Sequence, residues 1–402
     1  MKNIYFDHAA TTPVDPLVLE AILPYFKDNY GNASSIHKFG QKAQQGVLEA
    51  RDMVANFLGC DSTEVIFTSG ATESDNIALS GVMSYYLESS KQEDKKYNHL
   101  ITTAFEHPAI LETAQVLEMK GVEVSYLMPD KNGLMQVSEI EKAIKPETIL
   151  ISVMYVNNEV GTIQPIAEIG KLVNKINQQR VKDGQRKIIF HTDAVQAVNY
   201  CDCNVKKLGV DLLSLSGHKI YGPKGIGALY VKKGATLKRI SQGGHQEYGL
   251  RAGTLNTPGI VGLGKAISLV KSAETQKSIE NIKKLRDKLA KEIPAQIDKT
   301  EINGDLVKRV PANINFRFKN VEGESILLML DLEGFSVSTG SACASGSLKP
   351  SHVLLAMGIP QEDAHGSLRI TLGKGNTEEE IDKFIQVLPP IIKKLRQMSP
   401  LK

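Results

Sequence analysis

The chain has 402 residues, and its 48 Lys and Arg against 45 Asp and Glu give a formal net charge of +3 at pH 7. This near balance argues against nucleic acid or a membrane surface as the main partner. No apolar run approaches the length of a membrane span, and the polar first residues predict no leader peptide. Four cysteines in a chain of this length do not indicate a disulfide framework, so we expect a reducing cytoplasm.

Helical and strand-like patterns alternate along most of the chain. Asp15-Pro16 is expected to begin a helix that runs to about Lys27, and a second helix covers 41–58 before Gly59. Short apolar runs then predict seven strands, at 64–68, 99–103, 122–127, 148–155, 187–192, 211–215 and 226–231. Because helical stretches separate most of these runs, we predict an α/β fold with a mainly parallel seven-stranded sheet.

The pattern changes after residue 260. A long helical stretch from about 260 to 292 leads away from the sheet. The remainder carries shorter elements, namely strands at 312–318, 335–338 and 367–372 and helices at 322–332 and 377–396. We therefore predict a large domain at 13–260 and a smaller α+β domain made of 1–12 and 261–402.

Small, hydroxyl and titratable residues gather where the predicted strands end. They form five segments, at 68–74, 106–108, 157–161, 191–196 and 216–219. Ligands of open α/β sheets bind in the crevice at the carboxyl ends of the strands. Five such loops together indicate a binding site at this edge of the sheet.

Two of these segments could bind a carbonyl compound that carries a phosphate. A partly desolvated Lys219 could act as an amine nucleophile, although a solvated lysine in a turn is the alternative. The segment 69–72 opens a helix whose N–H groups suit a phosphate, or it is an ordinary helix cap. Ser216 and His218 could supply further phosphate donors.

Two other residues indicate which compound this is. Asp193 directly follows an apolar strand, where its charge needs a partner such as a protonated ring nitrogen or a structural salt bridge. His107 could cap the helix that Pro108 opens, or lay its ring on a planar ligand. An amine, a phosphate cradle, an acid and a stacking ring together specify pyridoxal phosphate (PLP) rather than a nucleotide.

Seven motifs follow one another along the chain: DHAATTP at 7–13, TSGATESDN at 68–76, NNEVG at 157–161, SGHKIYGPKG at 216–225, RAGT at 251–254, STGSAC at 338–343 and AHGSLR at 364–369. Nearly end to end, they resemble those of the NifS/IscS-type cysteine desulfurases. These are fold-type I PLP enzymes of the class V aminotransferase group.

The resemblance implies a role for each cofactor-binding residue. Lys219 would hold PLP as a Schiff base, Asp193 would pair with its ring nitrogen, and His107 would stack on the ring. Gln196 would bond the ring hydroxyl, with Asn158 close to it and to the substrate carboxylate. The phosphate would be held by Ala71, Thr72, Ser216, Gly217 and His218, and by Thr254 of a neighbouring subunit, which implies a homodimer.

The resemblance also implies the reaction, with Lys219, His107 and Cys343 as the catalytic residues and Arg369 as the clamp for the substrate carboxylate. Only small residues surround Cys343 at 338–347, so we expect a mobile nucleophile there rather than a buried apolar thiol. L-cysteine displaces Lys219, the freed amine removes the Cα proton, and the Cys343 thiolate attacks the substrate sulfur. The products are alanine and a Cys343 persulfide.

The sulfur acceptor would be a NifU/IscU-like iron–sulfur scaffold or a thiolation enzyme. No metal is expected in the PLP site, although Cys343 would be the residue to share an iron–sulfur cluster with a scaffold partner. The segment after Cys343 has the long form typical of NifS and IscS rather than SufS. The chain stops at Lys402 without the longer tail through which IscS-like members engage their scaffold, so we expect NifS-like docking or a dedicated pathway.

Some residues depart from the family pattern or point elsewhere. Proline is usual in the family where this chain has Ala33, and serine is usual where it has Ala252 and Thr339. Cys60 and the C-x-C pair at 201–203 are interpreted as structural, because no second pair completes a metal site. The alternative functions are a selenocysteine lyase, an aminotransferase of the same class, and a non-catalytic sulfur-relay protein.

Overall fold

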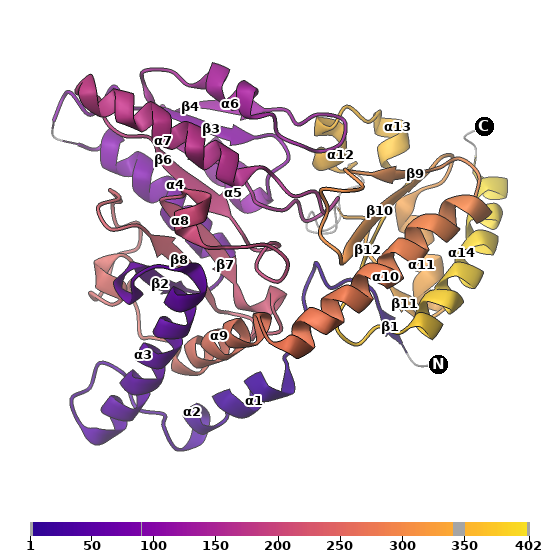
Figure 1. Ribbon diagram of the computed structural model, residues 1–402, viewed down its shortest axis with the longest axis horizontal. Helices are drawn as coiled ribbons and strands as arrows, with labels where there is room; N and C mark the ends of the chain where they lie inside the picture. The colour runs from indigo at the N-terminus through magenta and orange to yellow at the C-terminus, as the bar shows by residue number, and fades with distance from the viewer. Residues whose placement is uncertain (1–2, 90, 341–349, 400–402) are drawn as a thin grey trace.

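The central sheet has seven strands in the order β2-β8-β7-β6-β5-β3-β4 (Figure 1). They are β2 (Val65–Thr68), β3 (His99–Thr103), β4 (Glu123–Leu127), β5 (Thr148–Ser152), β6 (Ile189–Asp193), β7 (Leu212–Ser216) and β8 (Gly227–Val231). Neighbours from β4 to β7 are parallel, whereas β8 is antiparallel to β7 and β2. The computed structural model describes residues 3–89, 91–340 and 350–399, and it confirms the predicted α/β class and mainly parallel sheet.

Helices cover both faces of this sheet. One face packs against α3 (Lys38–Leu58), α7 (Ile166–Lys182), α8 (Val205–Leu208) and α9 (Thr257–Val270), and the other against α4 (Ala71–Leu87) and α5 (Pro108–Glu118). Successive strand side chains alternate between the two cores, as Ile66 and Phe67 show. The strands are therefore apolar on both sides, which is why they read as continuous hydrophobic runs.

Two predicted helices are each interrupted. The helix expected from Asp15 to Lys27 is α1 (Pro16–Ile22) followed by α2 (Pro24–Lys27), because Pro24 has no N–H to continue the first helix. The stretch predicted at 260–292 divides into α9 and α10 (Ala273–Gln296). The Ser272 hydroxyl accepts from the N–H of Thr275 and caps the second of these helices.

A smaller C-terminal domain has its own antiparallel sheet, in the order β12-β10-β9. Its strands are β9 (Thr300–Asn303), β10 (Asn313–Phe318) and β12 (Ser367–Thr371), while β1 (Ile4–Tyr5) pairs with β11 (Phe335–Ser336). Its helices are α11 (Gly323–Leu332), α12 (His352–Ala356), α13 (Gln361–Ala364) and α14 (Glu378–Met398), and α6 (Val137–Ala143) completes the larger domain. The two short strands β1 and β9 were not predicted.

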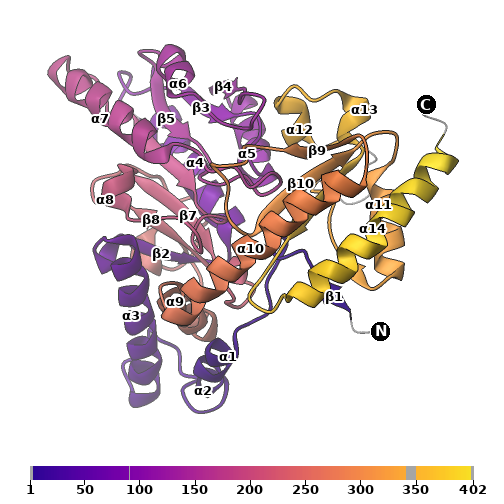
Figure 2. The same ribbon diagram turned by 45° about the vertical axis from the view of Figure 1, so that its right-hand side comes forward.

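The long helix α10 starts beside α9 and runs along the smaller domain next to α14 (Figures 1 and 2). A separate core forms in the smaller domain, where Phe6 from the N-terminal segment packs against Phe335 and Phe384. The division at 13–260 and at 1–12 with 261–402 stays a prediction.

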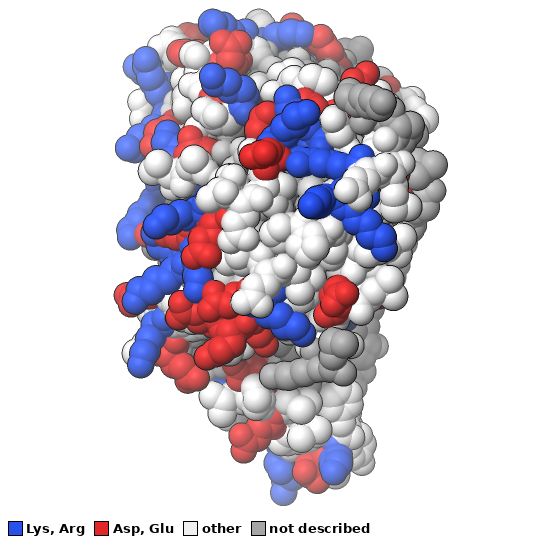
Figure 3. All heavy atoms as spheres, turned by 90° about the vertical axis from the view of Figure 1, so that its right-hand side faces the viewer, with Lys and Arg blue, Asp and Glu red and all other residues white. Residues whose placement is uncertain are grey.

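Acidic and basic side chains both occur on the face that the smaller domain presents in Figure 3. Within the described ranges, no helix is long and apolar enough to cross a membrane.

Candidate active site

A cavity of about 600 Å³ opens at the carboxyl ends of the central strands, where the smaller domain meets the sheet. The loops after β2, β3, β5, β6 and β7 all contribute to its wall, and Arg369 on β12 closes it from the other domain. The wall contains most of the predicted site residues: Ala71, Thr72, His107, Asn158, Asp193, Gln196, Ser216, His218, Lys219 and Arg369. The structure thus brings together residues that span three hundred positions of sequence, as we expected from the strand ends.

Lys219 lies at the end of a 3-10 turn, Gly217–Lys219, that directly follows β7. Its amine points into the cavity wall, where Nζ donates to the carbonyl oxygens of Ala9 and, at 2.7 Å, Ala10. The side chain is half-buried rather than extended into solvent from a turn. This placement favours the interpretation of Lys219 as an amine in the cavity, rather than as a solvated lysine in a turn.

Asp193 ends β6 and is buried. The Val195 N–H donates to its Oδ1 at 2.9 Å. Burial raises the pKa of Asp193 to about 6, against the opposing effects of that hydrogen bond and of the Lys219 charge. A carboxylate in such a place is stabilised by a cation, so the site favours a ligand with a protonated ring nitrogen.

Two further acids lie close behind Asp193. Burial raises the pKa of Glu106 to about 8 and holds the pKa of Asp75 well above its ordinary value, and the Asp193 charge adds to both effects. Glu106 is therefore mostly protonated at pH 7 and ionisation of Asp75 is disfavoured, so the negative charge in this part of the wall lies mainly on Asp193. Sequence reasoning missed this pair, although Glu106 directly precedes His107 and Asp75 follows the predicted helix start.

His107 caps a helix and also lines the cavity, whereas its stacking on a planar ligand stays a prediction. It is the N-cap of α5, where its Nδ1 accepts from the Ala109 N–H at 3.1 Å, and it also lines the cavity. Burial, together with the charges of Lys219 and His352, lowers the pKa of His107 to about 4. The ring is therefore neutral at pH 7 and carries its proton on Nε2, which suits it to lie against a planar cofactor.

The anion site is predicted at the start of α4. Ala71 and Thr72 form its first turn, where backbone N–H groups have no acceptor within the helix, and both line the cavity. His218 is held by a 3.2 Å contact between its Nδ1 and the hydroxyl of Thr11. Burial and the charges of Lys219 and Lys224 lower the pKa of His218 to about 4, so it offers a neutral N–H rather than a charge.

Arg369 is buried, and its guanidinium is fixed by two acceptors. Nη1 donates to the carbonyl oxygen of Asn158 at 3.0 Å, and Nη2 to Oδ1 of Asp7 at 2.8 Å. Within the described part of the chain, its Nε has no hydrogen-bond partner. Gln196 is fixed in a similar way, because its Nε2 donates to the carbonyl oxygen of Ala9 at 3.0 Å.

The segment that contains Asp7, Ala9 and Thr11 was noted in the sequence only for its resemblance. In the structure residues 9–11 line the cavity, and the segment contacts Lys219, Gln196, His218 and Arg369. Two predicted phosphate ligands do not line the cavity: Gly217 is buried inside its turn, and Thr254 is exposed on the loop before α9. Their roles stay predictions.

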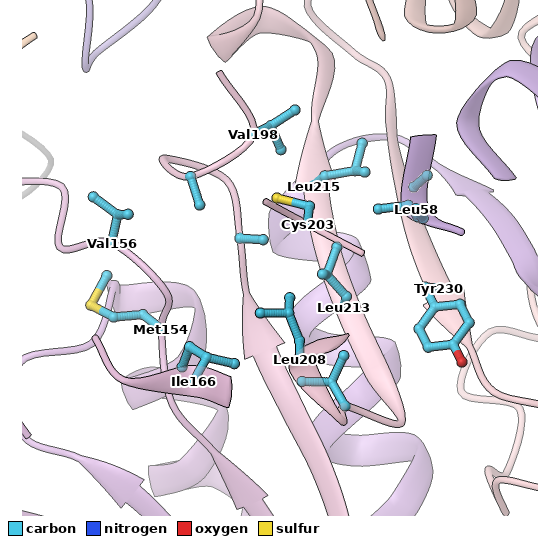
Figure 4. Close-up of a cluster of buried hydrophobic side chains, with 14 of the residues drawn as sticks. Leu58, Met154, Val156, Ile166, Val198, Cys203, Leu208, Leu213, Leu215 and Tyr230 are labelled. Carbon is cyan, nitrogen blue, oxygen red and sulfur yellow. The ribbon is translucent and has the colours of Figure 1, made fainter. Parts of the chain in front are cut away.

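The cysteines fall into two groups. Cys343 lies outside the described residues. Cys203 is buried among apolar side chains such as Leu213 and Leu215 of β7 (Figure 4). Burial raises the pKa of the Cys201 thiol to about 12 and the pKa of the Cys203 thiol still further. The pKa of the Cys60 thiol is also raised by burial, to about 12. These three thiols are packing groups at neutral pH.

The chain resembles known proteins over its whole length. The sequence profile of the class V aminotransferases matches residues 4–384. A Clostridium botulinum protein named cysteine desulfurase IscS is 50% identical over 402 residues, which cover 100% of this chain and 97% of that protein. A solved NifS-like protein superposes with a TM-score of 0.87 at 37% identity, over 98% of this chain and 100% of that one. The solved structure of SspA in complex with cysteine superposes with a TM-score of 0.79 at 37% identity, over 93% of this chain and 99% of that one.

The chain therefore belongs to the class V aminotransferase family, a group of PLP-dependent enzymes. Within that family it belongs with the cysteine desulfurases of the NifS/IscS type. The described residues fit PLP on structural grounds, since a buried acid, a helix start and a lysine amine share one cavity. Lys219 would hold the cofactor covalently, with Asp193 at its ring nitrogen and Ala71 and Thr72 at its phosphate.

Proposed function

We propose that this enzyme takes sulfur from L-cysteine, releases L-alanine, and carries the sulfur as a persulfide on Cys343. The observation that carries the proposal is the placement of Lys219, Asp193 and Arg369 around one cavity. An amine, an acid for a ring nitrogen and a guanidinium for a carboxylate are the groups that an amino-acid substrate of a PLP enzyme needs. The relatives named cysteine desulfurase and the SspA complex with cysteine support this choice of amino acid.

Each residue has a defined task. When bound, PLP serves as the electron sink that stabilises negative charge at the substrate Cα. Arg369 binds the substrate carboxylate and thereby directs the Cα–H bond toward Lys219, whose amine accepts the proton. The neutral His107 would lie against the bound cofactor, and its low pKa keeps a second positive charge away from Lys219.

Sulfur transfer is the task of Cys343. Its thiolate attacks the substrate sulfur, so that an S–S bond forms while the Cβ–S bond breaks and the electron pair of that bond stays with the carbon skeleton. Protonation of that skeleton gives alanine. The sulfur then leaves with a nucleophile of the acceptor.

The decisive variant is Cys343→Ala, assayed as the PLP-loaded enzyme. We expect no sulfide or persulfide from L-cysteine, whereas the absorption of the bound cofactor and its loss on borohydride treatment stay as in the wild type. Turnover of cysteine at the wild-type rate would refute the proposal and favour another class V reaction. A selenocysteine lyase would release selenium from selenocysteine while leaving L-cysteine unchanged, and an aminotransferase would form a keto acid. A non-catalytic relay protein would be colourless.

We further infer a homodimer in which Thr254 serves the site of the neighbouring subunit. Thr254 is exposed and outside the cavity of its own chain, as this role requires. Large apolar side chains are exposed on and between the first three helices, namely Leu17, Leu19, Leu23, Phe26, Tyr30, Ile36 and Phe39. Exposed apolar side chains in this number suit a permanent subunit contact. Sedimentation of the protein as a monomer at micromolar concentration would contradict this inference.

The acceptor is, by our proposal, a scaffold for iron–sulfur assembly of the NifU/IscU kind or a thiolation enzyme, and the enzyme works in the cytoplasm. The IscS name of the relatives supports a scaffold. The thiols of Cys60, Cys201 and Cys203 are all free, which suits a reducing compartment. Incubating the persulfide-bearing enzyme with each candidate acceptor, and measuring sulfur transfer by mass, distinguishes the two kinds.

A further inference from the structure

A second cavity, much smaller than the active site, also has Lys219 and Gln196 in its wall. Its volume is about 20 Å³, which is room for one water molecule, because a buried water needs roughly 10–15 Å³ of such space. The polar residues that line it include His8, Asn157, Asn199, Asn313 and Thr371. The cavity thus has the size and the polarity at which proteins hold internal water.

Two buried polar atoms of this wall have no hydrogen-bond partner within the part of the chain that the structure describes, namely Nδ1 of His8 and Oδ1 of Asn313. Nδ2 of Asn313 donates to the carbonyl oxygen of Glu159 at 3.2 Å, which leaves Oδ1 as an acceptor. Burial lowers the pKa of His8 to about 4, so its ring is neutral at pH 7 and Nδ1 donates or accepts according to the tautomer. A buried polar atom without a partner is costly, so both atoms indicate a ligand in this cavity.

The ring of His8 is held in place by its surroundings. The His8 N–H donates to the carbonyl oxygen of Thr371 at 3.2 Å, and the ring of Tyr5 packs edge to face against the imidazole with 5.0 Å between the centroids. Gly373 makes room for the imidazole, because a Cβ at that position would lie 2.4 Å from Nδ1. The ring therefore cannot turn freely to bring Nδ1 to another partner.

The chemistry of the wall selects water over an ion. No Asp or Glu side chain of the described residues lines the cavity, whereas Lys219 does, so its positive charge would repel a cation. An anion would meet Oδ1 of Asn313, which can only accept. A water molecule can donate to that oxygen and can donate to or accept from Nδ1 of His8. Water therefore satisfies both atoms in either tautomer of the histidine.

The cavity is connected to Lys219 through the residues that follow His8. The lysine Nζ donates to the carbonyl oxygens of Ala9 and Ala10. The Ala9 N–H donates to Oγ1 of Thr371 at 2.9 Å, and Ala9 and Thr371 both line the small cavity. A shift of His8 would therefore move the two carbonyl groups to which the lysine amine is bonded.

We propose that this cavity binds one internal water molecule between His8 and Asn313, and that His8 acts through this water as a positioning residue for Lys219. The water fixes residues 8–10, so that the carbonyl groups of Ala9 and Ala10 direct the lysine amine when it accepts the Cα proton. This second part rests on the role proposed above for Lys219, whereas the water site does not.

The first test is a crystal structure of the PLP-loaded wild-type enzyme at a resolution that shows ordered waters. We expect density for one water at about 2.7–3.2 Å from both Nδ1 of His8 and Oδ1 of Asn313. His8→Phe should lose this water, because a C–H group replaces Nδ1. His8→Asn should keep it, because the amide places a polar atom at the same number of bonds from Cα. A dry cavity in the wild type would overturn the proposal, and so would a water that remains in His8→Phe.

The second test compares kcat and KM for alanine release from L-cysteine. His8→Phe should lower kcat, and the exchange of the Cα proton with deuterated water, roughly 10-fold, as for a displacement somewhat below the 1 Å that costs about 100-fold. KM should stay within about 2-fold of the wild type, because Arg369 does not line the small cavity. His8→Asn should restore kcat. His245→Phe is the control, since His245 is exposed and lines neither cavity.

An unchanged kcat in His8→Phe would refute the positioning role. A His8→Asn enzyme as slow as His8→Phe would also refute it, because the packing of a ring would then matter rather than the polar atom. Lys219→Ala tests the underlying role separately. Exchange of the Cα proton at the wild-type rate in that variant would refute Lys219 as the base and leave the water site standing.

Discussion

The two walls of the cavity are built differently. The cofactor wall consists of Asp193, Lys219 and His107 at the ends of neighbouring strands and loops of one sheet. The substrate wall consists of Arg369, which is fixed by Asp7 and Asn158 from distant parts of the chain. In the first wall, burial raises the pKa of Asp193 and lowers that of His107. In the second, hydrogen bonds from distant parts of the chain set the position of the Arg369 guanidinium.

The largest expected effect comes from removing the charge of the cofactor wall. Asp193→Asn keeps the hydrogen bond from Val195 but cannot stabilise a protonated ring nitrogen. We expect kcat for alanine release to fall about 10²- to 10³-fold, as when one preorganised electrostatic partner is removed from a reaction site. A shift in the cofactor absorption should accompany the fall. Asp211→Asn is the matched control, since Asp211 binds the Phe190 N–H beside the same strands but before β7 begins. An active Asp193→Asn enzyme would show that burial of this acid serves folding alone.

A smaller effect is expected at the substrate wall. Arg369→Lys keeps the charge but cannot bond Asp7, Asn158 and a carboxylate at once. Losing one charge-assisted hydrogen bond should raise KM for L-cysteine roughly 10- to 100-fold, with the cofactor spectrum of the resting enzyme unchanged. Arg317→Lys on the adjacent strand β10 controls for the general effect of shortening a buried arginine in this sheet. An unchanged KM would mean that another group binds the carboxylate.

The same contrast explains what the sequence could predict. The seven strands were found because each is a short apolar run, and Asp193 and Lys219 were found because they follow such runs directly. Asp7 was not assigned a role, because its partner Arg369 lies 362 residues further along the chain and no local pattern connects them. The helix breaks at Leu23 and Ser272 were missed because the apolar pattern continues across both. Local chemistry is visible in a sequence, whereas pairings between residues far apart along the chain need the folded chain.

The last prediction concerns stability in the protein without cofactor, and its expected effect on activity is the smallest. Glu106 has a folded pKa of about 8 against an ordinary 4.5, because it is fully buried. Between these values the unfolded chain has released the proton while the folded chain keeps it, so stability falls as pH rises and the full penalty is present above pH 8. Glu106→Gln removes this contribution. Between pH 5 and pH 9 the variant should therefore lose less free energy of unfolding than the wild type, by on the order of a few kcal/mol, measured by urea unfolding at both pH values. Glu139→Gln, at an exposed helix position, should show no such difference. If Glu106→Gln lost stability with pH as steeply as the wild type, the acids behind Asp193 would be ionised in the fold, and the negative charge that faces the cofactor would be shared rather than concentrated on Asp193.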